Sequence, residues 1–168
     1  MKKDKRNRFL KGKRGQISIM LVLLIPTLLW LIFYFDGRMQ ARYVKDQTQV
    51  VLDTATKAGA LTGIDYQIGN SKPICVIPYD EHDQNYSGYH VTKKMLLANL
   101  NTLPEDVAQQ LRQDAQNNRI EGMLDSDLAA GGYVSLAVTV EFKPKVALFF
   151  NNYRIKIQST SKCEVIVD

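Results

Sequence analysis

The longest hydrophobic run in the chain lies close to the N-terminus. Residues 17–35 contain no charged side chain, and charge returns at Asp36. At ~1.5 Å per residue, a helix of this length spans the ~30 Å hydrocarbon core of a bilayer. A core helix of a soluble protein rarely continues so far without a polar stripe. The pattern therefore predicts a transmembrane helix over residues 16–35, and Pro26 within it predicts a kink or a packing point.

A helical repeat continues beyond the apolar run. Small and apolar residues recur at helical spacing on one face, namely Ala41, Val44, Thr48, Val51, Leu52, Ala55 and Ala58. The opposite face is polar and includes Asp53 and Lys57, an acid-before-base pair at i, i+4. We expect one helix from the membrane to about Leu61, with residues 36–63 as its continuation. Its small-residue face is suited to packing on this chain's own domain or on neighbouring helices of an assembly.

Two segments near the C-terminus alternate between apolar and polar residues. Residues 133–142 and 153–168 follow this period of two and predict two long, half-buried strands. The connection over residues 143–152 is long enough for an antiparallel pair. Residues 71–80 predict a further short strand between prolines.

Two segments in the middle of the chain have helical spacing. Residues 91–102 and 102–118 predict helices, and Thr102 and Glu105 have the spacing of a capping box. Pro104 would then lie in the first helical turn, where proline is tolerated. The expected fold class is therefore α+β: a long N-terminal helix packed on a small antiparallel sheet with one face covered, and helices inserted between.

The charge distribution divides the chain. Residues 1–15 hold eight Lys or Arg and one Asp, and subtracting this local charge of +7 from the overall +5 leaves −2 for the rest. Basic residues concentrated before an apolar span predict a cytoplasmic tail, with residues 64–168 forming an extracytoplasmic α+β domain. Because the basic excess is confined to this tail, we expect no nucleic-acid partner.

The N-terminal segment differs from a removable secretory signal. Its apolar run exceeds the ~7–15 residues of a signal peptide. Residues 34–40, which read YFDGRMQ, offer no small-x-small cleavage site after the run. Complete removal of the segment is therefore not expected. Gly59 and Gly63 mark candidate ends for the helix that follows.

The two cysteines, Cys75 and Cys163, lie far apart and form no CxxC motif. In an extracytoplasmic domain they are candidates for a disulfide, and otherwise they serve as small apolar residues. His82 and His90 flank an acidic loop, which is more typical of a solvated surface than of a metal site. We expect no metal.

The sequence contains no recognisable catalytic motif. GxSxG, a glycine-rich phosphate loop and HExxH are all missing. Ser159 and Ser161 lie in a predicted strand with no histidine near them in the sequence. We therefore expect neither an enzyme nor a cofactor.

A run of five apolar residues, VALFF, occupies residues 146–150 in the connection between the two long strands. One interpretation is that it folds back into the core. The other is an exposed surface that contacts a partner or the membrane. That surface would be formed by Val146, Leu148, Phe149 and Phe150.

The N-terminal third resembles the TadE/TadG-like proteins of tight adherence (Flp-type) pilus systems. In that family a basic tail and an RGQ-like triplet precede an apolar helix with a Leu-Pro-like pair, an FGR-like exit and an Ala-rich helix end. The counterparts lie within residues 13–61, and they are Arg14-Gly15-Gln16, Ile25-Pro26, residues 35–38 (FDGR) and residues 54–61 (TATKAGAL). The two alternating strands are also similar in layout.

The resemblance implies a pseudopilin or minor pilin, inserted through its helix in the membrane or a pilus base and contacting other pilus proteins. It also implies a prepilin peptidase that cuts after Gly15, so that the mature chain begins at Gln16. Pilin-type sites commonly carry Glu at the fifth mature position, where this chain has Met20. The alternative function is a single-pass anchor for an extracellular ligand-binding or sensor domain.

Overall fold

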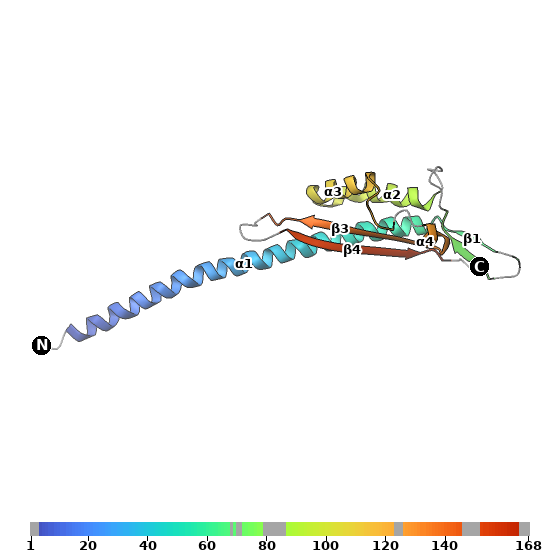
Figure 1. The fold of residues 1–168 in the computed structure, drawn as a ribbon. Helices are drawn as coiled ribbons and strands as arrows, with labels where there is room; N and C mark the ends of the chain where they lie inside the picture. The colour runs from blue at the N-terminus through green and yellow to red at the C-terminus, as the bar shows by residue number, and fades with distance from the viewer. Residues whose placement is uncertain are drawn as a thin grey trace.

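The computed structural model describes residues 4–67, 69, 72–78, 87–122, 126–145 and 152–164, with side chains from Met20 onward. The elements are α1 (Asp4–Ala60), β1 (Ile64–Tyr66), β2 (Ile74–Val76), α2 (Gly88–Asn99), the 3₁₀ turn η1 (Leu100–Thr102), α3 (Glu105–Gln116), α4 (Ser126–Ala130), β3 (Tyr133–Phe142) and β4 (Tyr153–Lys162). The expected α+β class is confirmed. Figure 1 shows α1 as a long shaft whose N-terminal half stands clear of the other elements, while its C-terminal half lies against strands and helices.

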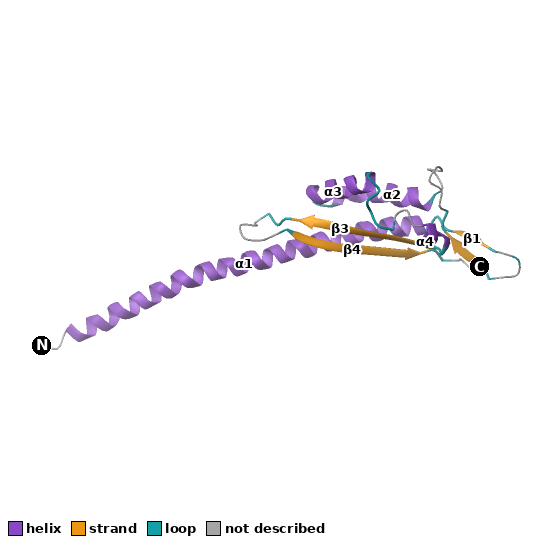
Figure 2. Cartoon of the chain, in the orientation of Figure 1, coloured by secondary structure: helices purple, strands orange, loops and turns teal. Residues whose placement is uncertain are grey.

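Helix α1 is continuous over 57 residues and includes Pro26. Figure 2 shows one gently curved helix with no sharp kink along it. Proline at position 26 removes only the hydrogen bond to the carbonyl of residue 22. The neighbouring Leu23 carbonyl accepts a hydrogen bond from Thr27 Oγ1 at 2.6 Å, which satisfies a polar group beside the interruption.

The end of α1 lies one residue before the predicted one. Its last carbonyls accept hydrogen bonds from the amides of residues 61–63, which closes the final turn. Gly59 is not the end of the helix but lies inside it. A Cβ at this position would overlap the hydroxyl of Thr92 on α2, so glycine lets the two helices approach closely.

The strands form two antiparallel pairs. β3 and β4 are joined over their full length, from Tyr133 opposite Lys162 to Phe142 opposite Tyr153. β1 and β2 form a second, smaller pair of three residues each. β1 and α4 were not predicted from the sequence. β4 ends at Lys162 rather than continuing to residue 168, and residues 165–168 lie outside the described part of the chain.

The hydrophobic core lies between the C-terminal half of α1, helices α2 and α3, and one face of the β3–β4 pair. Its largest fully buried side chains include Leu52, Leu96, Leu111, Leu136 and Val140. The alternation predicted for the strands is confirmed on β3, where residues 136, 138, 140 and 142 are all buried. The opposite face of β4 is exposed. One sheet face is therefore covered, as the pattern predicted.

The capping box predicted before α3 is wrong. Thr102 belongs to η1, and its hydroxyl donates to the carbonyl of Asn99 at 2.8 Å. Pro104 takes the N-cap position, and its carbonyl accepts from the amide of Ala108 at 2.9 Å. Because η1 prolongs the preceding helix as far as Thr102, that side chain is committed to the preceding turn and not to α3.

The packing of α1 on the domain gives a first prediction. Leu52 is fully buried, so Leu52→Ala should lower the free energy of unfolding by ~2–5 kcal/mol. Val50 lies on the exposed side of the same helix, and Val50→Ala should change the free energy of unfolding by less than ~0.5 kcal/mol. Urea unfolding of the detergent-solubilised chain, followed by circular dichroism, measures both. Equal effects of the two substitutions would contradict this packing.

Candidate functional site

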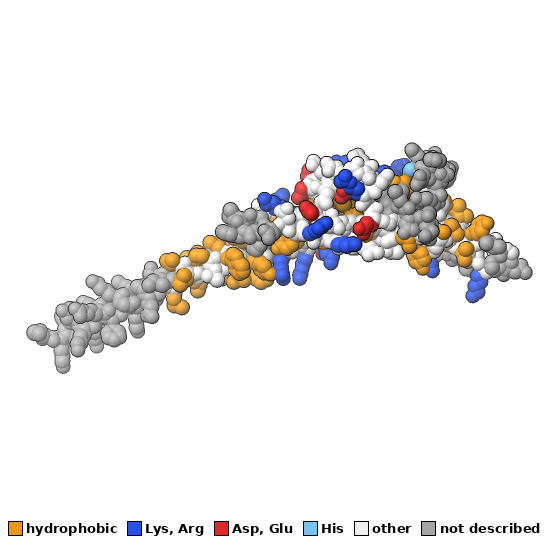
Figure 3. Space-filling view, viewed as in Figure 1, with side chains coloured by type: hydrophobic (Ala, Val, Ile, Leu, Met, Phe, Trp, Pro, Cys, Tyr) orange, Lys and Arg blue, Asp and Glu red, His pale blue; other side chains and the backbone are white. Residues whose placement is uncertain are grey.

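The segment of α1 from Met20 to Ile32 exposes apolar side chains to its surroundings. From Met20 to Ile32 the large apolar residues are exposed, and only 6% of the most apolar 18-residue window is buried. Figure 3 shows this segment as an apolar shaft leading away from the domain. Its length and composition are compatible with a single transmembrane span, and they fit a membrane anchor or a signal sequence.

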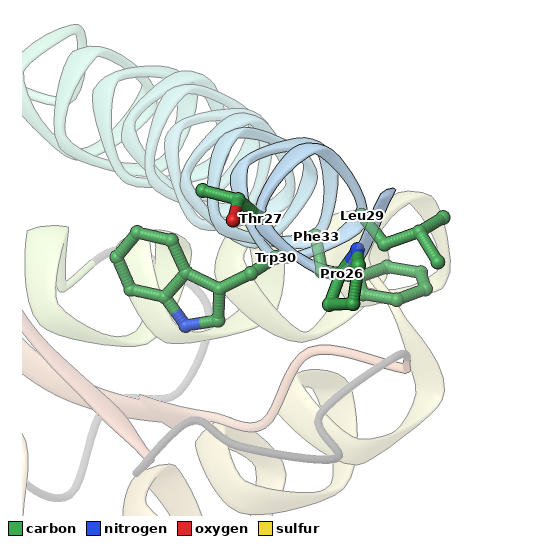
Figure 4. A pocket seen from close by; sticks show the side chains of 5 residues that line it. All are labelled: Pro26, Thr27, Leu29, Trp30 and Phe33. Atoms are coloured by element: carbon green, nitrogen blue, oxygen red, sulfur yellow. The ribbon is translucent and has the colours of Figure 1, made fainter. Parts of the chain in front are cut away.

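A shallow hollow of about 550 Å³ lies on the shaft beside Pro26. Figure 4 shows the indole of Trp30 on one side of it, with Pro26, Leu29 and Phe33 on the other. The ring of Trp30 stacks on that of Tyr34, with centroids 5.7 Å apart. The hollow is almost wholly apolar, so it is suited to a hydrocarbon or to an apolar side chain of a neighbouring helix.

The exit from the apolar segment is held by a short series of side-chain contacts. The guanidinium of Arg38 lies 4.9 Å from the ring centroid of Tyr34, a cation–π distance. One turn further, Gln40 donates to Asp36 at 2.6 Å and accepts from the backbone amide of Lys145 at 3.2 Å. Gln40 therefore ties the chain after β3 to the point where α1 leaves its apolar segment.

A groove of about 850 Å³ opens beside this exit, between α1, η1, the start of α3 and the end of β3. Its lining combines apolar and charged residues and includes Met39, Tyr43, Leu103, Pro104, Phe142 and Lys145. The predicted partner residues Val146, Leu148, Phe149 and Phe150 follow directly in the sequence and lie outside the described residues. The groove itself had no signal in the sequence, because its walls come from segments far apart in the chain.

A polar cluster joins α1 to β4 inside the domain. Asp53 Oδ1 accepts hydrogen bonds from Ser159 at 2.5 Å and from Gln49 at 2.8 Å. The hydroxyl of Thr56 lies 2.9 Å from those of both Ser159 and Ser161. The helical pattern placed Asp53 on the polar face at i, i+4 spacing to Lys57, whereas its carboxylate bonds β4 and Gln49 instead. Ser159 and Ser161 of β4 face α1 at this point, and the Asp53 carboxylate and the Thr56 hydroxyl of α1 are their hydrogen-bond partners.

In the Asp53–Ser159 contact the serine hydroxyl donates directly to the carboxylate. A serine nucleophile needs a general base, usually an imidazole, between it and the carboxylate. His90 lies on α2, with its ring 5.0 Å from that of Tyr89. The cluster therefore fastens α1 to the sheet. The sequence signal for this cluster was the presence of two serines, Ser159 and Ser161, on the face of β4 that turns toward α1.

Cys75 and Cys163 are joined by a disulfide. It links β2 to the residue after β4 across 88 positions of sequence, with a Cα–Cα distance of 5.9 Å. Gly63 makes room for the bridge, because a Cβ there would overlap both sulfur atoms. Of the two roles left open by the sequence, the structure assigns these cysteines to the bridge.

The remaining candidate residues form no site in the described part of the chain. Gly15 and Gln16 lie within α1, where only the backbone is described. His82 and its acidic neighbours lie outside the described residues, so the loop considered for a metal is not placed. Among the described residues, no group of three or more His, Cys, Asp or Glu could hold a metal ion.

Comparison with protein-family models, with curated proteins and with solved structures finds no match for this chain.

The disulfide generates a second prediction. Closing a loop of 88 residues stabilises the folded state by ~4–5 kcal/mol in the chain-entropy model, and measured losses are typically ~2–5 kcal/mol. The double variant Cys75→Ser, Cys163→Ser should therefore unfold at a lower urea concentration than the oxidised chain. Reducing the wild-type chain with a thiol should produce the same loss, while the double variant should not respond to the thiol. A wild-type midpoint that stays constant on reduction would contradict the assignment.

Proposed function

We propose that this chain is a single-span, membrane-anchored, pilin-like subunit of a tight adherence or related type IV-like pilus assembly. The observation that carries the proposal is the division of α1. Its segment from Met20 to Ile32 is apolar and exposed, while its C-terminal half packs in the core of the domain, and the helix is continuous between them. Anchor and domain are therefore one rigid element and not two parts joined by a linker.

A continuous helix suits a subunit whose outer domain must keep a fixed orientation relative to the membrane while it contacts other subunits. A flexible linker would let the domain turn freely about its anchor. Here the helix continues through Asp36 and Gly37, and Gln40 ties the end of β3 to it. The eight basic residues before the span favour a cytoplasmic N-terminus and an extracytoplasmic domain.

The exposed side of α1 offers a surface for neighbouring subunits. Beyond the apolar segment, Met39, Tyr43 and Val50 remain 71%, 57% and 59% exposed. Their spacing of four and seven residues places them along one side of the helix, where Met39 and Tyr43 also border the groove beside η1 and α3. The apolar hollow beside Pro26 offers a further contact surface within the proposed span. A helix of another subunit fits such a surface through shape and apolar contact.

A second function is an anchored domain that binds an extracellular ligand. The groove between α1, η1, α3 and β3 supports it, because its volume of about 850 Å³ is within the range of small-molecule sites. This reading predicts a ligand-dependent rise in the melting temperature of the detergent-solubilised chain. The pilus reading predicts instead that the chain co-purifies with other pilus components.

Charges on the exposed side of α1 test the assembly proposal. The double variant Met39→Glu, Val50→Glu should fold normally, because both side chains are exposed, but it should reduce co-purification and surface piliation at least several-fold. Gln113→Glu, Gln116→Glu is the matched control, since it adds two charges at exposed positions of α3. Normal piliation in the Met39→Glu, Val50→Glu strain, or in a deletion strain, would overturn the proposal.

The bond between Gly15 and Gln16 gives a separate prediction about processing. In the membrane-extracted protein we expect an intact mass that begins at Gln16, the result implied by the family resemblance. Gly15→Leu should leave the chain at full length, because a peptidase that cuts after glycine has no room for a branched side chain. A full-length wild-type mass would instead make residues 1–15 a permanent tail of a signal anchor.

A further inference from the structure

A basic hollow lies on α1 at the point where its apolar segment ends. Arg38, Arg42 and Lys45 recur at i, i+4 and i+7, and together with Ala41 of α1 and Ile155 of β4 they line a hollow of about 290 Å³. All three basic side chains are exposed. Figure 3 shows Lys and Arg side chains gathered beneath the domain where the apolar shaft joins it.

In the described part of the chain, no carboxylate lies within 4.0 Å of the three cations of this basic hollow. Among the described residues, the ion pair within 4.0 Å is that of Lys156 with Glu121 on the sheet. The two acids nearest in sequence do not neutralise the cluster: Asp36 accepts a hydrogen bond from Gln40, and Asp46, next to Lys45, lies more than 4.0 Å from all three cations. Three like charges held around one hollow repel each other, so a bound anion would lower the electrostatic free energy of the site.

The basic hollow begins at the height of a lipid headgroup layer, and its two upper side chains are long enough to reach down to it. Arg38, Arg42 and Lys45 follow Asp36 by roughly 3, 9 and 14 Å of helix, at ~1.5 Å per residue. The polar layer of each leaflet is ~5–8 Å thick. Arg38 already points back toward the apolar segment, because its guanidinium lies over the ring of Tyr34. The long stems of Arg42 and Lys45 can reach down in the same way.

We propose that the basic hollow binds the phosphate of an anionic phospholipid headgroup in the leaflet that faces the domain. This rests on the membrane anchor in the proposed function, but not on a role in pili. A guanidinium donates two parallel hydrogen bonds to phosphate oxygens, and two arginines one turn apart can hold one headgroup between them. The stacked rings of Trp30 and Tyr34 lie directly below on the same side of the helix, where aromatic residues prefer the membrane interface.

The basic hollow also sets how the domain faces the membrane. The groove on the other side of α1 places Glu105 and Asp106 at a similar position along the helix, together with Lys143 and Lys145. The two acids and two lysines on that side offset each other, so it attracts an anionic surface less than the three cations of the basic hollow do. The domain should therefore turn its α1–β4 side toward the lipid and keep the groove open to the outside.

Lipid selectivity in nanodiscs tests the proposal. The full chain is inserted into nanodiscs of phosphatidylglycerol and phosphatidylcholine in equal amounts, and lipids retained on the released protein are counted by native mass spectrometry. Arg38→Gln, Arg42→Gln, Lys45→Gln should retain roughly threefold less phosphatidylglycerol than wild type. The matched control Lys57→Gln, Lys94→Gln, Arg119→Gln removes three exposed charges far from the apolar segment and should retain the wild-type amount. The basic residues of 1–15 are present in all three proteins, so their contribution cancels.

Each outcome has a definite meaning. Retention that falls as NaCl rises, yet persists when phosphate replaces chloride at equal ionic strength, supports a lipid headgroup over free phosphate. Equal retention by the two triple variants overturns the lipid site and leaves the pilus proposal standing. A chain that stays out of the nanodiscs overturns both the site and the anchor. Binding of a polyglutamate peptide without phosphatidylglycerol enrichment would reassign the hollow to an acidic protein.

Discussion

The fold depends on the packing of the C-terminal half of α1 against the β3–β4 pair. A two-stranded ribbon alone is marginally stable, and it needs a helix to cover its apolar face. Val51, Leu52 and Ala55 supply that cover, while α2 and α3 close the core around them. The same helix carries the exposed apolar segment, so folding of the domain also fixes the direction of that segment relative to the domain.

Polar contacts make this packing specific. Apolar surfaces alone would tolerate a helix that slides or rotates by a residue. The carboxylate of Asp53 and the hydroxyl of Thr56 meet Ser159 and Ser161 at one register, and any shift would leave buried polar groups without partners. At the other end of the packed region, Gln40 holds the amide of Lys145. The helix is thereby fixed at two points along its axis.

Local patterns predicted the regular elements well, because those patterns are physical properties of short segments. The range of β3, the burial of Val44 and Leu52, and the α+β class all follow from periodicity. The predictions failed where a residue's partner is distant in sequence. Asp53 is an example, because its partner Ser159 lies 106 residues away in sequence. The capping box at Thr102 failed for a local reason, because the Thr102 hydroxyl bonds Asn99 three residues earlier, within the turn that ends η1. The groove and the basic hollow need β3, β4 and α3 in place before they exist.

The disulfide divides the chain into two mechanical parts. Residues 75–163 and the bridge form a covalently closed ring that contains α2, α3, α4, β3 and β4. Helix α1 lies outside this ring and is joined to it by one short connection through β1 and β2. A force that pulls α1 along its axis is therefore opposed by side-chain packing and by the contacts of Asp53, not by the ring, which stays closed under load. Sliding α1 out of this packing would uncover the apolar face of the β3–β4 pair, while the disulfide would still hold residues 75–163 in one closed loop.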